Sequence, residues 1–140
     1  MSKLKEKALH ASEMFASHRG YKVLDTAYKA QNGEQLDMVL DDEGTIVFVE
    51  VLARSDSKKG FPSERMDDAA RKRLEDTALC WLAEHANEVD NTSIRFDIMS
   101  LVVFAESRAL IRHHINALGH GISLAEPDAV EEPVLAAAAA

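Results

Sequence analysis

The sequence has a single cysteine, Cys80, so a disulfide within the chain is excluded. Disulfides persist in oxidising compartments, and a single thiol without activating neighbours is typical of a reducing one. No run approaches the roughly 18 apolar residues that a membrane-spanning helix needs. No apolar stretch follows the basic amino-terminal residues, so no secretory signal is expected. The sequence therefore predicts a cytoplasmic protein without a membrane partner.

Several motifs that carry well-known chemistry are also missing. The sequence contains no nucleophilic serine motif, no glycine-rich loop that cradles phosphate and no zinc-binding pattern. The six histidines lack a metal-ligand spacing, and His113 and His114 would point to opposite faces of a strand. Carboxylates inside apolar segments are left as the best functional candidates.

The composition is that of a folded protein with little general attraction for nucleic acid. The chain has 140 residues, 46% hydrophobic and 29% charged, which predicts one domain with a real core. Its net charge of −8 argues against strong general nucleic-acid binding. Nevertheless, residues 54–73 hold seven basic side chains against four acidic ones. This segment is either a nucleic-acid contact or a solvated loop and helix face.

The order of apolar patterns predicts an α/β domain with a central mixed sheet flanked by helices. An acidic, alanine-rich tail at 119–140 has no patterned core, so we expect a domain over 1–118 and a disordered tail. The expected helices are Lys3–Arg19 and one capped by Ser63 that ends near Glu88; the expected strands are Tyr21–Ala30, Leu36–Leu40, Thr45–Ala53, Ile94–Phe104 and Ala109–Ile115.

Two acids, Asp37 and Glu50, each lie within an apolar run of the predicted hairpin. Burying a carboxylate in such a run is costly unless a partner compensates its charge. If Leu40 pairs with Thr45 across a loop at 41–44, the two acids share one face diagonally, about 7 Å apart. One interpretation is a carboxylate pair that holds Mg²⁺. The other is a structural Asp near a strand edge and a Glu that forms a salt bridge with Arg54 or another base.

A set of short motifs follows in a characteristic order along the chain. They are Gly20-Tyr21, Gly33-Glu34 with Asp37, Val47-Phe48-Val49-Glu50-Val51 with Arg54, Gly60 with Pro62, Arg71-Lys72-Arg73, Arg95-Phe96-Asp97 and Ile115-Asn116-Ala117. Over residues 4–118 the sequence resembles the YraN-like family of small bacterial proteins, which is similar to archaeal Holliday-junction resolvases. The resemblance implies a restriction-endonuclease-like fold with a PD-(D/E)XK type of site.

The resemblance also assigns roles and exposes departures. It implies that Asp37 and Glu50 are metal-binding, catalytic acids, but Leu52 stands where the family has a lysine. One residue is added between Gly33 and Asp37, and the family's amino-terminal Gly-Glu falls on Ala8-Leu9. Losing one preorganised electrostatic partner costs on the order of 10²–10³ in rate. We therefore consider Arg54, or Lys72 of the following helix, as replacements for the lysine.

The leading hypothesis is a nuclease-fold protein that acts on or binds branched or single-stranded DNA, with Mg²⁺-dependent cleavage weak or lost. The alternative is a non-catalytic module that binds DNA or a protein. In that module the nucleic-acid contacts would be basic side chains after Glu50: Lys58, Lys59, Arg71, Lys72 and Arg73. A third interpretation is an acidic scaffold domain without a nucleic-acid role. A homodimer is compatible with the sequence, which does not define the oligomeric state.

Overall fold

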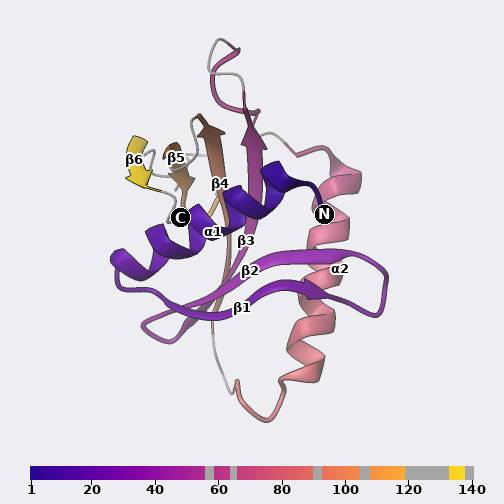
Figure 1. Cartoon of the computed structure of the whole chain (residues 1–140). Helices are drawn as coiled ribbons and strands as arrows, with labels where there is room; N and C mark the ends of the chain where they lie inside the picture. The colour runs from indigo at the N-terminus through magenta and orange to yellow at the C-terminus, as the bar shows by residue number, and fades with distance from the viewer. Residues whose placement is uncertain (56–58, 64–65, 90–92, 105–107, 119–132, 138–140) are drawn as a thin grey trace, which may run out of the picture.

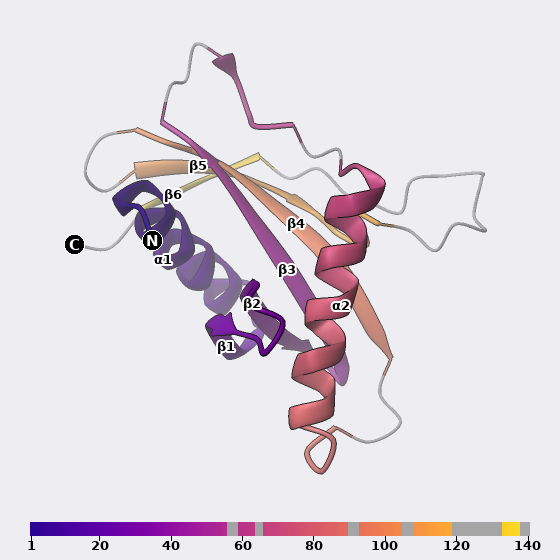
Figure 2. The same ribbon diagram turned by 90° about the vertical axis from the view of Figure 1, so that its right-hand side faces the viewer.

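A mixed β-sheet forms the centre of the molecule, and one helix covers each of its faces (Figures 1 and 2). The computed structural model describes residues 1–55, 59–63, 66–89, 93–104, 108–118 and 133–137. The predicted α/β class, with a central mixed sheet flanked by helices, is confirmed. The elements are α1 (Lys3–His18), β1 (Lys22–Lys29), β2 (Gln35–Asp42), β3 (Thr45–Arg54), α2 (Asp68–Glu84), β4 (Ile94–Val103), β5 (Arg108–His114) and β6 (Pro133–Ala137).

The strand order in space follows the order along the chain, from β1 to β6. All neighbouring strands are antiparallel except β3 and β4, which run parallel. A parallel pair needs a long crossover, and α2 lies in the connection between these two strands. Figure 2 shows α1 and α2 on opposite sides of β3 and β4.

Strand β3 is the centre of the core because it is apolar on both faces. Val47, Val49 and Val51 belong to the cluster that packs under α1, whereas Ile46 and Phe48 belong to the cluster under α2. Helix α2 also contributes buried residues to the core. The buried members of that helix are Leu74, Thr77, Ala78 and Trp81. Two-sided burial fixes β3, and with it the position of Glu50.

Helix α2 is shorter than its apolar pattern suggested. The predicted cap at Ser63 is wrong, because the N-cap is Asp67, whose carboxylate accepts from the backbone N–H of Ala70 at 2.8 Å. Aspartate is favoured there because it satisfies a free N–H at the positive end of the helix. The helix ends at Glu84 rather than near Glu88, since His85 leaves the helical conformation with φ −114°.

Strand β6 lies within the segment for which we expected no regular structure. Pro133–Ala137 pairs antiparallel with β5, so that expectation fails for these five residues. Backbone pairing needs no apolar periodicity, which explains why the pattern did not reveal the strand. Residues 119–132 and 138–140 of the predicted tail lie outside the described residues. Among the described residues, neither helix has the length and apolar character required to span a bilayer.

Candidate functional site

The hairpin between β2 and β3 turns on two residues, Glu43 and Gly44. Both have positive φ, 49° and 97°, as a two-residue turn that matches strand twist requires. The register places Asp42 opposite Thr45. The predicted pairing of Leu40 with Thr45 is therefore wrong by two residues, because the strands continue into what we expected to be a four-residue loop.

A shift of two residues leaves each paired side chain on the predicted face of the sheet, because side chains alternate between the two faces with a period of two. The β2–β3 ladder ends at the pair of Met38 with Val49, and the next residues along the two strands are Asp37 and Glu50. The two acids therefore lie where the paired segment ends, close enough for the charge of Asp37 to act on Glu50. Beyond this point β2 leaves β3, while β3 stays paired with β4 as far as Arg54.

The Asp37 carboxylate takes over the hydrogen bonds that β2 gives up. Its Oδ2 accepts from the backbone N–H of Val51 at 2.8 Å and from Lys5 Nζ at 2.8 Å. Its Oδ1 accepts from the Gln35 side-chain amide at 3.1 Å. Asp37 is 3% exposed, so these donors replace water almost completely. A buried backbone N–H needs a partner, and the carboxylate supplies it where the ladder ends.

Lys5 is the basic residue at the two acids, and no sequence pattern pointed to it. It lies in the first turn of α1, and its Nζ also donates to the backbone carbonyl of Val51. In the sequence, Lys5 resembles any charged residue on the polar side of an amphipathic helix. Only the packing of α1 across β3 brings its ammonium to a site that lies 32 residues further along the chain.

The two basic residues that we considered as replacements for the lysine are engaged elsewhere. Arg54 donates from Nη1 to the backbone carbonyl of Lys59 at 3.0 Å. The hydrogen bond that the structure shows for Arg54 is therefore with Lys59 and not with Glu50. Lys72 forms an i,i+4 ion pair with Asp76 at 3.1 Å on the exposed side of α2.

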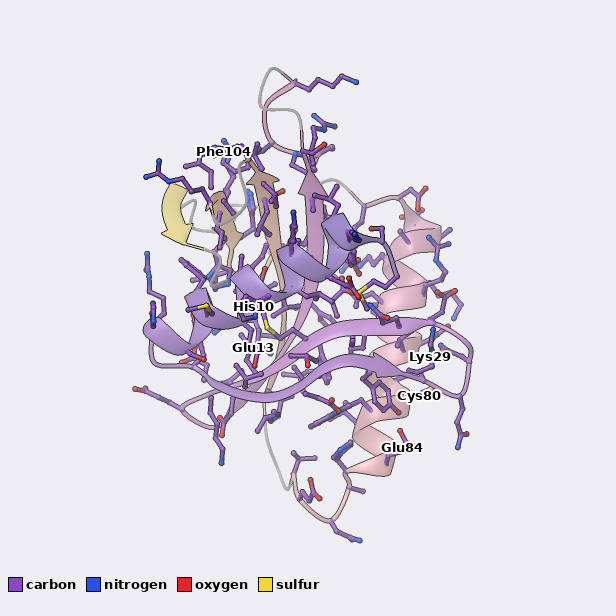
Figure 3. The ribbon with its side chains drawn as sticks, in the orientation of Figure 1. His10, Glu13, Lys29, Cys80, Glu84 and Phe104 are labelled. Atoms are coloured by element: carbon purple, nitrogen blue, oxygen red, sulfur yellow. The ribbon has the colours of Figure 1, made fainter. Side chains whose placement is uncertain are left out.

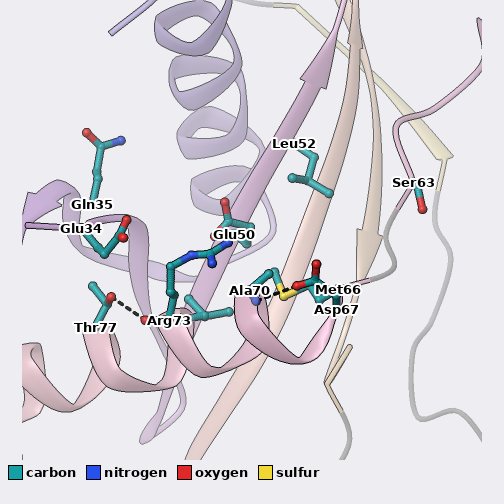
Figure 4. Close-up of a pocket in the computed structure, with 11 residues that line it drawn as sticks. Glu34, Gln35, Glu50, Leu52, Ser63, Met66, Asp67, Ala70, Arg73 and Thr77 are labelled. Carbon is teal, nitrogen blue, oxygen red and sulfur yellow. Dashed lines mark hydrogen bonds between the residues drawn. The ribbon is translucent and has the colours of Figure 1, made fainter.

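A cavity of about 380 Å³ lies between β3 and the first half of α2. Glu50 and Leu52 line it from the strand, and Arg73 and Thr77 line it from the helix. Figure 4 shows the Arg73 side chain reaching from α2 toward Glu50. Glu34, from the turn before β2, lies at the edge of the same cavity. The cavity therefore places a carboxylate and a guanidinium on facing walls, with the apolar Leu52 side chain beside the carboxylate.

The electrostatics of Glu50 reflect this enclosure. Burial, together with the charge of the neighbouring Asp37, raises the pKa of Glu50 to about 8 against the opposing effects of Lys5 and Arg73. Two carboxylates that share one site resist ionising together. A cation placed between them would relieve that repulsion, so the arrangement favours cation binding.

The predicted nucleic-acid contacts on α2 divide into two kinds. Arg71 and Lys72 lie near Glu75 and Asp76 one turn further along the helix, at 3.7 and 3.1 Å. Arg73 instead lines the cavity. Of the loop residues, Lys59 is exposed, and Lys58 lies outside the described residues. The structure thus brings one of the five predicted contacts, Arg73, to the acids.

The Arg95-Phe96-Asp97 motif contributes to a hydrogen-bond network around Asp97. Asp97 is fully buried and accepts two hydrogen bonds from the Arg95 guanidinium, both at 2.9 Å. His113 Nε2 lies 2.8 Å from its Oδ2, and the backbone N–H of Asn116 donates to its Oδ1 at 2.8 Å. No sequence pattern indicated this role of His113, although an acid inside an apolar strand requires a partner.

The other chemically reactive side chains lie away from the acids. Cys80 is half-buried on α2, on a cavity wall that it shares with Glu84 (Figure 3). His10 lies on the exposed side of α1, on the other face of the sheet (Figure 3). Among the described residues, no group of three or more His, Cys, Asp or Glu side chains could hold a metal.

A family model described as uncharacterised protein family UPF0102 matches residues 10–101, which include Asp37, Glu50 and Arg73. The chain belongs to the UPF0102 family. This confirms the resemblance to the YraN-like proteins. Lys5 precedes the part of the chain that the UPF0102 model matches.

Individual UPF0102 proteins are similar over most of their length. A UPF0102 protein of Clostridioides difficile is 36% identical over 99 residues, which cover 71% of this chain and 82% of that protein. One from Bifidobacterium longum subsp. infantis is 34% identical over 98 residues, covering 70% and 78%. One from Lachnoclostridium phytofermentans is 33% identical over 105 residues, covering 75% and 86%.

Proposed function

We propose that this UPF0102 protein binds nucleic acid and hydrolyses phosphodiester bonds slowly, with Mg²⁺ held at Asp37 and Glu50. The observation that carries the proposal is the position of the two acids. They follow the last β2–β3 pair, where β2 leaves β3, and their charges interact. Glu50 also opens onto a cavity that Arg73 lines from α2. The resemblance to nuclease-fold proteins supports the same assignment of the two acids.

The donor set fits Mg²⁺. Carboxylate oxygens of Asp37 and Glu50 and the carbonyl oxygen of Val51 are hard ligands, and two of these groups already bind the Lys5 ammonium. So few protein ligands suit Mg²⁺, which keeps several of its waters when it binds to proteins. When bound, the metal would offset the negative charge of a phosphodiester and make a nearby water more acidic.

The residues of the chain would position the substrate. Arg73 faces Glu50 across the cavity, and its guanidinium can donate two parallel hydrogen bonds to phosphate oxygens. Leu52 lines the cavity next to Glu50 but has no donor for the developing charge. We therefore expect cleavage slower by about 10²–10³ than with a lysine at position 52.

A second candidate function is a non-catalytic module that binds nucleic acid. The apolar Leu52 side chain beside Glu50 favours it, because binding needs Arg73 and the basic segment but no activated water. The two candidates differ in one outcome, which is whether bound DNA is cut.

A single assay separates the two functions. Labelled branched and single-stranded DNA would be incubated with the protein and Mg²⁺ or Mn²⁺, and binding and cleavage would be followed together. The proposal expects slow cleavage that stops when the metal is chelated and that Glu50→Ala abolishes. Binding without cleavage would support the non-catalytic module, and cleavage that survives Glu50→Ala would reject the proposed site.

A further inference from the structure

The Lys5 ammonium is bound by oxygens in the way that a small cation is bound. Its Nζ lies 2.8 Å from Asp37 Oδ2 and also contacts the carbonyl oxygen of Val51. We propose that Lys5 is a resident cation of the site, which occupies oxygens that a metal would take and must leave before Mg²⁺ binds. The inference rests on the proposed metal site and adds a residue that controls access to it.

Simultaneous occupancy by Lys5 and a metal is unfavourable for two reasons. Both cations would need the same Asp37 carboxylate oxygen and the same Val51 carbonyl oxygen. Both would also lie within a few ångströms of each other at a residue that is 3% exposed, where water screens their repulsion poorly. Binding of Mg²⁺ therefore carries the cost of breaking the Lys5–Asp37 ion pair.

Lys5 can leave the site without unfolding the helix. The Lys5 side chain is 27% exposed, so part of it already contacts solvent, whereas the Asp37 side chain is 4% exposed. Helix α1 is anchored further along by its buried residues, among them Ala8, Leu9 and Phe15. The flexible four-carbon stem of lysine can therefore swing outward while the backbone stays in place.

Lys5 on α1 has a different role from that of a lysine at position 52 on β3. A lysine at position 52 would extend into the cavity beside Glu50, leaving the Asp37 oxygens free for a metal. Lys5 approaches from α1 and takes one of those oxygens. Its ammonium is thus a competitor of the metal, and its removal should tighten metal binding.

The test is a titration with Mn²⁺ alone, in which free Mn²⁺ is measured by electron paramagnetic resonance. Lys5→Met removes the ammonium but keeps a flexible apolar stem, and Lys3→Met is the matched control from the exposed start of the same helix. We expect Lys5→Met to bind Mn²⁺ about tenfold more tightly than the wild type, roughly the effect of one charge-assisted hydrogen bond. We expect Lys3→Met to match the wild type. Equal or weaker binding by Lys5→Met would overturn the inference, as would tighter binding by both variants.

A measurement on the wild type covers the case in which Lys5→Met fails to fold. Acetylation of each lysine would be quantified by mass spectrometry with and without Mg²⁺. We expect Mg²⁺ to raise the acetylation rate of Lys5 severalfold and to leave Lys3 unchanged. An unchanged rate at Lys5 would overturn the inference. Neither readout depends on cleavage, so Mn²⁺ competition without DNA cutting would retain this inference and reject the proposed enzyme activity.

Discussion

Lys5 Nζ and Asp37 Oδ2 lie 2.8 Å apart, and their ion pair joins the first turn of α1 to the strand that carries the site. The same carboxylate oxygen accepts from the backbone N–H of Val51, where β2 has left β3. Asp37 therefore has a structural role in the metal-free protein besides the one we propose in metal binding.

The first prediction concerns the stability that Asp37 provides. Asp37→Ala leaves the Lys5 ammonium and the Val51 N–H without their acceptor, so we expect a loss of about 3 kcal/mol in the free energy of unfolding. Asp76→Ala is the control, because it breaks an exposed Lys–Asp pair on α2. That change should cost less than about 1 kcal/mol. Urea unfolding measures both, and equal losses would contradict the buried role of Asp37.

The second prediction concerns the pH dependence of stability. Unfolded Glu50 titrates near its ordinary pKa of 4.5, and folded Glu50 has a pKa of about 8. Between these values the folded protein binds more protons than the unfolded chain, so Glu50 lowers the free energy of unfolding as pH rises. Glu50→Gln mimics the protonated acid and lacks this loss.

Urea unfolding of the wild type and Glu50→Gln at pH 5, 7 and 9 tests this difference. The variant should gain stability relative to the wild type as pH rises, by more than about 1.4 kcal/mol at pH 9. Subtracting the two curves removes the contribution of the other titrating groups. A difference that stays constant with pH would show that Glu50 titrates normally in the folded protein.

The third prediction concerns the missing lysine. Leu52→Lys places an ammonium in the cavity beside Glu50, where it can stabilise charge that develops on the phosphate. We expect DNA cleavage in Mg²⁺ to accelerate by about 10²-fold. Leu52→Met is the control, because it changes the shape of the side chain without adding charge. A cleavage rate that Leu52→Lys leaves at the wild-type level would mean that the cavity is not where phosphodiesters react.

The fourth prediction compares two arginines on α2. Arg73 lines the cavity, whereas Arg71 lies 3.7 Å from Glu75. We expect Arg73→Gln to weaken binding of single-stranded DNA several-fold, and to lower the salt dependence of binding by about one phosphate contact. Arg71→Gln, which removes the same charge, should have the smaller effect. Fluorescence anisotropy at several salt concentrations measures both, and an equal response would point to general charge attraction.

Much of the fold followed from the sequence because local patterns determine it. The two apolar faces of β3 predicted a central strand, and the acids within β2 and β3 predicted a shared site. The predicted hairpin register was wrong by two residues because Glu43 adopts a positive φ. Glycine is favoured in that conformation, so a glutamate there does not indicate a two-residue turn. The error did not change which face the paired side chains occupy, because it was an even number of residues.

Lys5 could not be predicted because its role depends on how α1 crosses the sheet. Nothing within the helix distinguishes it from Lys3 or Lys7, which carry the same charge. Arg54 and Lys72, which follow Leu52 in the sequence, both have partners elsewhere, whereas the structure brings Lys5 of the amino-terminal helix to Asp37. Long-range packing of this kind leaves no periodic signal in the sequence.

The most direct measurement is the rate of DNA cleavage as a function of Mg²⁺ concentration, in the wild type, Asp37→Asn, Glu50→Gln and Glu84→Gln. Glu84 is an exposed acid at the end of α2 and serves as the control for loss of one carboxylate. Our account predicts slow, Mg²⁺-dependent cleavage by the wild type and Glu84→Gln, and none by Asp37→Asn or Glu50→Gln. Cleavage that persists in either of those two variants, or a wild type that binds DNA but never cuts it, would contradict the account.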